Sequence, residues 1–343
     1  VDLNRNYGQD WGLDDDGSSP DPFSDVYRGS APFSEPETQA MRDFCNAHHF
    51  SAALKYHTYH NLLIHPWEAV PDLLTVDSAL FEEHARLLTR NNGYAHGTTN
   101  QVLFYLTNGG SDDWMYGEQV TKGKIMSMTP EVGALDDGFW PPDWRIEDLC
   151  EENMDQNLLQ AHLVGAYARV IDRSSPVFAG SDAVIPFSLQ RLGLDTGTYT
   201  VSVEPLLNVL SAGPSITFTG MDTLEVRTDT IAVQLMPGLA DGDPIRFVLA
   251  VDNAGYVVRD TIDRVFGAPA IPLADAGNDL SDWSTVDWGT TTSAYYSPPS
   301  SLTDSPSGDY VPFMVNDLTL DDAVDLSQAT SATLTFMARW NII

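Results

Sequence analysis

Three histidines lie within one short stretch, KYHTYHNLLIHPWE at residues 55–68, and imidazole is a common metal ligand. The stretch is rich in Tyr, Thr, Ile and Leu, which predicts a strand running into a loop rather than a helix. On a strand, His57 and His60 would point to opposite faces, because side chains alternate. A turn-like interval ending at Pro66 separates His60 from His65. The three histidines therefore cannot form one chelate, and at most one is expected at a shared site.

The elements around this stretch alternate between helix and strand patterns. Residues 34–50, SEPETQAMRDFCNAHHF, predict a helix with Ser34 as its N-cap and acidic residues in its first turn. A buried strand is expected over residues 51–59, which places the first histidine near its end. A second amphipathic helix is predicted over residues 77–91 and is closed by Gly93.

Two further elements complete this first region. KIMSMTPEVG, residues 124–133, predicts a strand with Glu131 near its end. Residues 150–171 predict a long amphipathic helix that ends the region. The alternation of helices and strands favours an α/β layer over residues 1–172.

Short β segments split by turn residues follow, so the pattern changes to all-β. VLAVDNAGYVV predicts a hairpin that turns at residues 252–255. We expect a β-sandwich of ordinary size over residues 173–270. Residues 271–343, rich in Ser, Thr, Asp and Gly, are expected to form a truncated β jelly-roll, with SPPSSLTDSPSGD as a surface loop. The aromatic side chains of both β modules are expected in their cores rather than on a carbohydrate-binding surface.

Composition excludes several classes of partner. The chain has 343 residues, enough for two or three domains, and 49 acidic residues against 17 Lys and Arg give a formal charge of −32. That charge repels the phosphates of nucleic acids and anionic membrane surfaces. No apolar stretch is long enough to span a membrane. Two cysteines make neither a disulfide framework nor a four-cysteine zinc site, and a Cys45–Cys150 bridge is left open.

Five segments, in order and at suitable intervals, carry a resemblance. They are DLNRNY at 2–7, YRGSAPFSEPET at 27–38, KYHTYHNLLIHPW at 55–67, YLTNGGSDDWMY at 105–116 and TPEVG at 129–133. Together they resemble the zinc carboxypeptidase family, the metallocarboxypeptidases related to the pancreatic enzymes. The likeness covers about half of this chain and the later part of that family's catalytic domain. It implies an α/β domain for residues 1–172, with a mixed β-sheet flanked by helices and an N-terminal truncation.

The resemblance selects His57 as a zinc ligand and implies that His60 and His65 are loop residues near the cleft. The family's other two ligands lie in an H-x-x-E motif upstream of DLNRN, a segment that this sequence does not contain. The chain begins without Met and ends in ATLTFMARWNII, apparently inside a strand, so we expect a fragment cut at both ends. Since one histidine cannot hold a catalytic zinc, the fragment itself is expected to be inactive.

The resemblance also assigns roles at the cleft. Glu131 corresponds to the general base, which takes a proton from zinc-activated water as that water attacks the peptide carbonyl. Asn4 and Arg5 correspond to the pair that binds the substrate's C-terminal carboxylate, a task suited to the forked guanidinium. Tyr105 corresponds to the mobile tyrosine that closes over the same carboxylate. Without the resemblance, each of these residues would be read as an ordinary structural side chain.

Two acidic features have more than one interpretation. Asp112 corresponds to the floor of the specificity pocket, where an acid favours C-terminal Lys or Arg, although the neighbouring Asp113 leaves the register open. LDDDGSSPD, residues 13–21, is as acidic as a calcium loop but lacks the ligand spacing, so it is expected to be mainly a solvated loop, with calcium as the alternative.

The sequence thus predicts a secreted, multidomain zinc metallocarboxypeptidase that releases single residues from peptide C-termini, with one zinc ion as cofactor. Its substrates would be peptide or protein C-termini, and its β modules would be accessory units that bind a surface or a partner. The alternative is a non-catalytic peptide- or matrix-binding protein on the same fold. Retention of Asn4, Arg5, His57, Tyr105 and Glu131 favours the enzyme.

Overall fold

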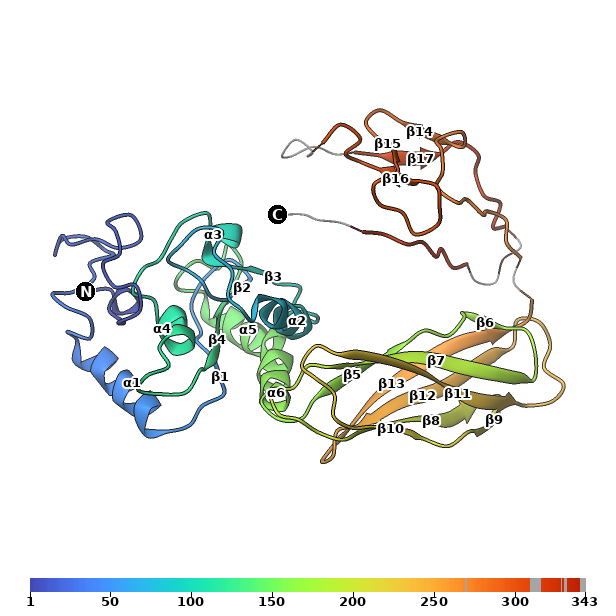
Figure 1. The fold of residues 1–343 in the computed structure, drawn as a ribbon, viewed down its shortest axis with the longest axis horizontal. Coiled ribbons are helices and arrows are strands. Elements are labelled where there is room, and N and C mark those ends of the chain that lie inside the picture. The colour runs from blue at the N-terminus through green and yellow to red at the C-terminus, as the bar shows by residue number, and fades with distance from the viewer. Residues whose placement is uncertain (269, 309–315, 328, 330–331, 340–343) are drawn as a thin grey trace.

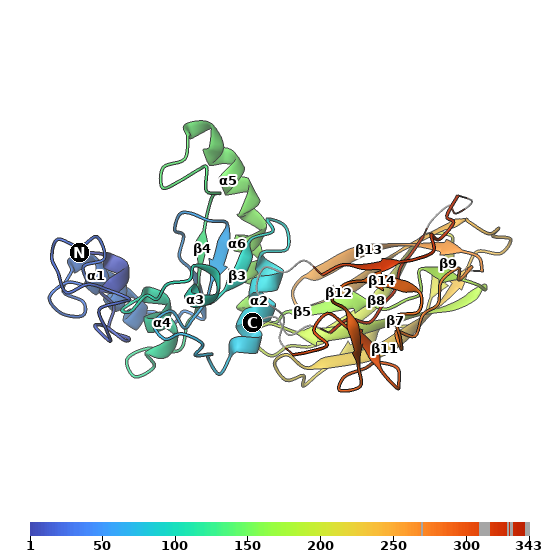
Figure 2. The same ribbon diagram turned by 90° about the horizontal axis from the view of Figure 1, so that it is seen from above.

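A computed structural model describes residues 1–268, 270–308, 316–327, 329 and 332–339 of the chain. Figure 1 and Figure 2 show a helix-containing first unit at one end and a longer β unit at the other. A third, smaller unit built of short strands follows at the C-terminal end of the chain.

The first unit is built on a mixed four-stranded sheet in the order β1-β4-β2-β3. Its strands are β1 (Ala52–Leu54), β2 (Leu62–Ile64), β3 (Ala95–Gly97) and β4 (Met126–Glu131). β4 pairs in parallel with β1 and antiparallel with β2, and every residue of β4 is buried. The prediction of a mixed sheet with helices is confirmed for this unit.

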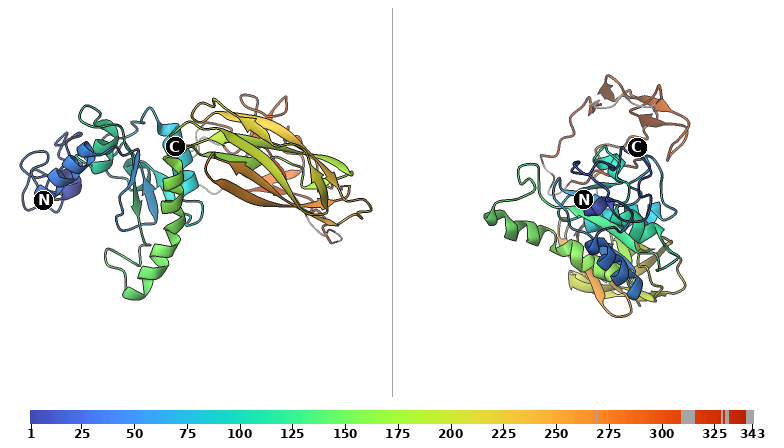
Figure 3. Two further views of the ribbon diagram at one scale, coloured as in Figure 1. Left: turned by 90° about the horizontal axis from the view of Figure 1, so that it is seen from below. Right: turned by 90° about the vertical axis from the view of Figure 1, so that its left-hand side faces the viewer.

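Short helices connect and flank this sheet. In chain order they are η1 (Leu3–Arg5), α1 (Pro36–Ala47), α2 (Ser78–Leu88), α3 (Thr99–Val102), α4 (Ser111–Gly117), η2 (Asp143–Arg145), α5 (Ile146–Glu152) and α6 (Met154–Leu163). Figure 3 shows α5 and α6 forming one arm that runs down the side of the unit.

The ends of the first two predicted helices differ from expectation. α1 begins at Pro36, a residue well suited to the first helical turn, and its N-cap is Glu35 without a side-chain capping bond. The Ser34 hydroxyl instead donates to the Glu35 carboxylate at 2.7 Å, so the predicted Ser34 cap is wrong. α2 ends at Leu88, and Gly93 adopts a left-handed conformation in the turn that follows.

The strand expected over residues 51–59 is much shorter. β1 covers three half-buried residues, and the chain then runs as a loop except for one isolated bridge between His57 and Glu131. Pairing of β1 with β4 stops there because the chain turns, and a second strand, β2, returns along the other side of β4. The apolar run LLI that precedes His65 is therefore a separate strand.

The helix predicted over residues 150–171 is wrong in its second half. α6 ends at Leu163, and β5 (Ala168–Asp172) pairs along its whole length with a strand of the second unit. The sequence ARVID alternates in a way that suits a strand, and the partner that pairs with it lies about twenty residues later. The boundary between the first and second units was predicted at residue 172. The pairing of β5 with β7 places it in the turn before β5.

The second unit consists of two sheets with one shared core. One sheet has the order β10-β8-β12-β13-β6 and the other β5-β7-β11-β9. The strands are β6 (Val177–Phe178), β7 (Asp182–Arg191), β8 (Tyr199–Leu207), β9 (Val209–Ala212), β10 (Ile216–Phe218), β11 (Val226–Leu235), β12 (Pro244–Asp252) and β13 (Val257–Phe266). Buried side chains of both sheets, such as Phe187 of β7 and Phe247 of β12, form one cluster. β12 and β13 form the predicted hairpin.

The first two units also share buried side chains. Leu63 of β2, Phe81 of α2 and Leu163 of α6 belong to one apolar cluster with Tyr167 and Leu192, which flank β5 and β7. The buried His84 ring of α2 adds a polar contact, since its Nε2 lies 2.7 Å from the Leu192 carbonyl oxygen. The first unit is therefore joined to the second by a continuous core.

The third unit contains two short strand pairs within its described residues. They are β14 (Trp283–Thr285) with β17 (Leu318–Leu320), and β15 (Gly289–Thr291) with β16 (Ser301–Thr303). A jelly-roll assignment stays a prediction. Of the predicted final strand, residues 332–339 are not in a strand, and 340–343 lie outside the described residues. Within the same described ranges both cysteines are unbridged, and no helix is long and apolar enough to cross a membrane.

Candidate active site

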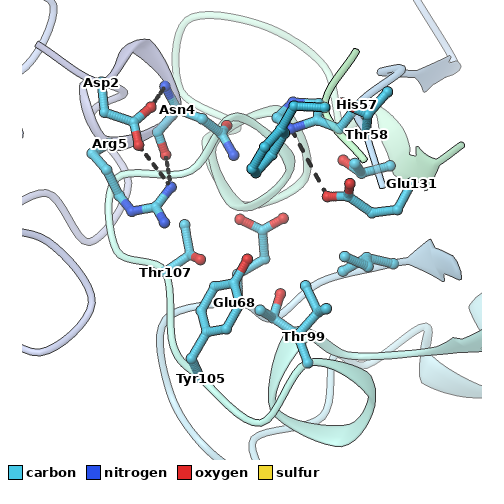
Figure 4. A pocket seen from close by; sticks show the side chains of 14 residues that line it. Asp2, Asn4, Arg5, His57, Thr58, Glu68, Thr99, Tyr105, Thr107 and Glu131 are labelled. Carbon is cyan, nitrogen blue, oxygen red and sulfur yellow. Dashed lines mark hydrogen bonds and ion pairs between the residues drawn. The ribbon is translucent and has the colours of Figure 1, made fainter. Parts of the chain in front are cut away.

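A cavity of about 230 Å³ opens beside the C-terminal end of β4 (Figure 4). Residues from η1, from the loops after β1 and β2, from α3 and its following loop, and from β4 meet there. The lining residues are Asp2, Asn4, Arg5, His57, Thr58, Ile64, Glu68, Thr99, Leu103, Tyr105, Thr107, Thr129, Glu131 and Phe139. Five of the six predicted site residues are thus brought together, and Asp112 is the exception.

The alternation of β4 gives the cavity its polar wall. MSMTPE places the Met126 and Met128 side chains in the apolar core and turns Ser127, Thr129 and Glu131 to the opposite face. Glu131, the last residue of the strand, reaches the cavity. This period-two pattern explains how a buried strand can supply a carboxylate to a polar site.

His57 and Glu131 are neighbours through their backbones. The His57 amide donates to the Pro130 carbonyl, and the Val132 amide donates to the His57 carbonyl, both at 2.9 Å. The side chains then lie alongside each other, with His57 Nδ1 3.9 Å from Glu131 Oε1. Burial lowers the pKa of His57 and raises the pKa of Glu131 to about 7. The pair therefore combines a neutral imidazole with a carboxyl group whose pKa lies near neutrality.

Asn4 and Arg5 lie at the opposite side of the cavity, on η1. The Asp2 carboxylate accepts from the Asn4 amide at 2.9 Å and lies 3.4 Å from Arg5 Nη1. The buried Arg5 donates through Nε to the Gly17 carbonyl and through Nη1 to the Asn4 carbonyl. Its Nη2 has no hydrogen-bond partner among the described residues, so it can donate to a ligand.

A second contact orients the Asn4 side chain. Its Oδ1 accepts from both the amide and the hydroxyl of Ser111, at 3.0 and 2.9 Å. The acceptor end of the carboxamide is therefore fixed to the start of α4, which leaves the Nδ2 donor facing the cavity. Asn4 and Arg5 together present hydrogen-bond donors that suit a carboxylate.

The remaining wall carries aromatic residues. Tyr105 lies in the loop after α3 and is 49% exposed, and burial of its ring raises the pKa of the phenol, which stays a neutral donor near pH 7. Phe139 comes from the loop after β4 and packs edge-on against Tyr59 with ring centroids 5.0 Å apart. Asp137 holds this loop by accepting from the Ala134 amide and pairing with Arg145 at 2.8 Å.

Asp112 does not line the cavity, which departs from its predicted place on an open pocket floor. Its side chain is fully buried on α4, where it accepts from the hydroxyls of Ser127 and Thr129 at 2.5 and 2.7 Å. The ammonium of Lys55 lies 3.2 Å from its Oδ1. Lys55 is 57 positions away from Asp112 in the sequence, but the fold brings the two side chains together. The negative charge of Asp112 is therefore already paired.

Glu68 and Asp2 are cavity carboxylates that the sequence interpretation missed, and Glu68 is the more deeply buried of the two. It lies in the loop after β2 and is 4% exposed, and Figure 4 shows its carboxylate pointing into the cavity between Arg5 and Glu131. Burial raises the pKa of Glu68 to about 7. An acidic residue in the otherwise apolar run IHPWEAV was a signal, since an unpaired glutamate is rarely buried.

The other two histidines of the opening stretch lie outside the cavity. The exposed His60 ring stacks on Tyr59, whereas the His65 ring is buried and stacks on Phe81 with centroids 5.3 Å apart. The prediction that neither belongs to the site is consistent with this placement, but His65 is a core residue and not a loop residue near the cleft.

In the acidic loop, Asp14 Oδ1 accepts from the amides of Asp16 and Gly17, both at 3.0 Å.

A zinc ion needs three protein ligands in a catalytic site. Across the described ranges, no group of three His, Cys, Asp or Glu side chains is close enough to hold a metal ion. His57 supplies one imidazole. Among the described residues, the only carboxylate within 4 Å of that imidazole is Glu131. The described donor set therefore does not fit a complete zinc site, and His57 would need ligands from outside it.

The model of the zinc carboxypeptidase family matches residues 1–156. This part of the chain belongs to the zinc carboxypeptidase family. The segment is 31% identical to human carboxypeptidase A6 over 161 residues, which are 45% of this chain and 36% of that protein. It is 33% identical to rat carboxypeptidase B over 158 residues, or 44% of this chain and 37% of the relative.

The chain thus spans little more than a third of the length of these curated zinc carboxypeptidases. Among solved structures, bovine thrombin-activatable fibrinolysis inhibitor in complex with tick carboxypeptidase inhibitor is 29% identical, with a TM-score of 0.42. The match covers 47% of this chain and 56% of that one. Membership of the family supports a peptide-hydrolase function in general and zinc as the family's cofactor.

Proposed function

We propose that the first unit binds the free C-terminal carboxylate of peptides and forms part of a zinc metallocarboxypeptidase that releases single C-terminal residues. One observation carries the proposal. The donors of Asn4 and Arg5 face, across a single cavity, the imidazole of His57 and the carboxyl group of Glu131. One side suits a terminal carboxylate, and the other suits hydrolysis of the adjacent peptide bond.

The carboxylate would be held by Arg5 Nη2 and Asn4 Nδ2, with Tyr105 adding its hydroxyl as it closes over the ligand. Arg5 is already fixed through Nε, and Asn4 through Oδ1, so little side-chain entropy is lost on binding. A peptide that continues beyond this point has no carboxylate to offer. The arrangement therefore supports an exopeptidase.

Glu131 would be the general base. Its carboxyl group lies beside His57 on the cavity wall, within reach of a water molecule bound in the cavity. It would take the proton of the attacking water and then pass it to the leaving amine. Zinc stays in the proposal as the cofactor of the complete site, with His57 as one ligand and further ligands from outside the described residues.

Binding of a free-acid peptide and its C-terminal amide tests the carboxylate site in the 343-residue chain. Isothermal titration should give tighter binding of the acid, by about tenfold or more for a charge-assisted contact. Arg5→Ala should abolish that difference, whereas Arg86→Ala, on the exposed face of α2, should leave it unchanged. Equal binding of acid and amide would refute the proposal.

The alternative is a non-catalytic peptide- or matrix-binding protein. The single imidazole in the described cavity favours it, since this set cannot hold zinc alone. Both the carboxypeptidase hypothesis and the binding-protein hypothesis require carboxylate binding. They differ in whether the protein hydrolyses a peptide. We expect the 343-residue chain to release no terminal residue even with added Zn²⁺, and a longer protein that supplies the missing ligands to do so. A longer protein with a full zinc complement and no turnover would favour the alternative.

The two β units are proposed to be accessory modules that attach the peptidase unit to a surface or partner, and the protein is proposed to be secreted. Their division into a β-sandwich and a jelly-roll belongs to the same proposal. The formal charge of −32 argues against nucleic acids or anionic membranes as the partner.

A further inference from the structure

We propose that two copies of this chain associate through the corner at which β8 continues into β9. The exposed apolar side chains of this surface, named here the β9 corner, are Leu206, Leu207, Leu210 and Met236. Residues of the β9 corner do not line the cavity of the first unit. Figure 1 shows β9 toward the end of the second unit that lies away from the first.

The fold gathers these four side chains around one turn. Asn208 joins β8 to β9 in a left-handed conformation, and its carbonyl accepts from the Met236 amide at 3.0 Å. Leu206, Leu207 and Leu210 lie within two residues of Asn208 in the sequence. The four apolar side chains are each between 42% and 57% exposed. Single exposed apolar residues are ordinary, whereas a group of them at one place marks an interaction surface.

The backbone of β9 is open beside this group. β9 is the edge strand of the sheet β5-β7-β11-β9, and among the described residues no strand pairs with its outer edge. Proteins usually protect such an edge with charged side chains or proline. The opposite edge strand, β5, carries Arg169 and Asp172, whereas β9 reads VLSA and carries no charge. The unpaired backbone groups of β9 can therefore extend the sheet with another strand.

The charge distribution selects a second copy as the partner. With a formal charge of −32, two copies repel each other over most of their surfaces. Residues 205–221 and 230–240, which supply the whole β9 corner, contain no Asp, Glu, Lys or Arg. A basic partner would be attracted to the acidic surfaces elsewhere on the chain. An uncharged apolar surface matches an identical surface, and there two acidic copies can meet without opposing like charges.

The strands beside the corner add little charge. Arg246 of β12 lies opposite Leu207 and is already paired with Asp263 at 2.6 Å. Asp182 of β7 lies opposite Gln234 of β11 and is exposed at the rim. Repulsion between two copies therefore comes from the rim and from the net charge, and salt screens both. Association through the β9 corner should consequently strengthen as the salt concentration rises.

A two-fold axis would place the same surface of each copy against the other, as in most protein dimers. β9 has four residues, so a ladder between two β9 strands provides few hydrogen bonds and the apolar side chains must supply most of the affinity. The dimer is therefore expected to be weak. Since β9 lies away from the first unit, both cavities would stay open, and one particle would carry two of them.

Sedimentation velocity of the 343-residue chain tests the proposal over about 1–200 µM protein, because dimer formation depends on concentration. The mass should rise from monomer to dimer, and at lower concentration in about 0.5 M NaCl than in dilute buffer. Leu210→Asp should weaken association by about tenfold or more, because it places an unpaired charge in the contact. Val226→Asp changes a residue of equal exposure at the opposite end of β11 and should leave association unchanged.

A second variant tests the surface from another strand. Met236→Asp follows the end of β11 and should weaken association as Leu210→Asp does, with circular dichroism showing that both variants keep the fold. A chain that stays monomeric over the whole range in high salt would overturn the proposal. A dimer that persists in both variants would assign the contact to another surface and overturn it as well. Association that weakens with added salt would mean an ionic contact, which contradicts the uncharged corner.

Discussion

Asn4 and Ser111 are joined by two hydrogen bonds that end on the same oxygen, Asn4 Oδ1. The contact links η1 to the start of α4, segments more than a hundred residues apart in the sequence. It decides which end of the carboxamide faces the cavity. Ser111, which has no role in the proposed chemistry, therefore orients the Asn4 Nδ2 donor in the binding site.

Ser111→Ala should weaken binding of a free-acid peptide by about threefold to tenfold, the value of one hydrogen bond of ordinary strength. The Ser111 amide would still hold Asn4 Oδ1, so binding should fall without being lost. Titration with the free-acid peptide benzoyl-glycyl-norleucine measures this, and Ser215→Ala, exposed in the second unit, is the matched control. An unchanged affinity would show that Asn4 is not oriented through its hydroxyl contact.

Lys55→Met should destabilise the chain by about 3 kcal/mol or more, because the Asp112 carboxylate would stay buried without its counter-ion. The double variant Lys55→Met with Asp112→Asn should recover much of that loss. Urea unfolding of the two single variants and the double variant gives the coupling energy of the pair. Strictly additive effects would mean that the ion pair does not hold the charge of Asp112.

Stability should fall as pH rises from about 4.5 to 7, in part because of Glu68. Its pKa is raised by burial from 4.5 to about 7, so in this range the folded protein binds more protons than the unfolded chain. The stabilisation is therefore fully present below pH 4.5 and is lost as pH passes through 7. Glu68→Gln cannot ionise and should show a shallower decline in urea unfolding between pH 5 and 8. Parallel profiles of the two proteins would contradict the raised pKa.

Leu192→Ala should destabilise the first two units together by about 2–5 kcal/mol, the usual cost of truncating a fully buried leucine. Its side chain lies in the cluster that contains Leu63, Phe81 and Leu163, so both units lose packing at once. Unfolding followed by tryptophan fluorescence and by circular dichroism should give coincident transitions. Leu206→Ala, which is 57% exposed, should have little effect. Separate transitions for the two units would show that the shared core does not couple them.

The sequence predicted best those elements and site residues that depend on their own neighbours in the chain. The strand ending at Glu131 follows from its own residues, and the five resemblance segments placed His57, Asn4, Arg5 and Tyr105 around one cavity. It failed where a distant partner decides the outcome. ARVID joins a sheet because β7 is there to pair with it, although the preceding helix pattern continues into it.

The acidic residues of the site show the same limit. Asp112 was expected at the floor of an open pocket because of the family resemblance, which does not show that Lys55, from the loop after β1, lies beside it. Glu68 was overlooked although it stands in a largely apolar run, because its burial beside the cavity becomes visible only in the fold. Charge pairing in a buried cluster is a property of the folded chain, and the order of residues alone does not reveal it.

The core shared by α2, α6 and the turns beside β5 and β7 has a mechanical consequence. A flexible linker would let the first unit rotate relative to the second, whereas a continuous apolar junction holds the two units in one orientation. A pulling force applied to the second unit would pass straight through Leu192 and Leu163 into the wall of the first. Attachment of the β units to any surface would therefore also fix the direction in which the cavity of the first unit opens.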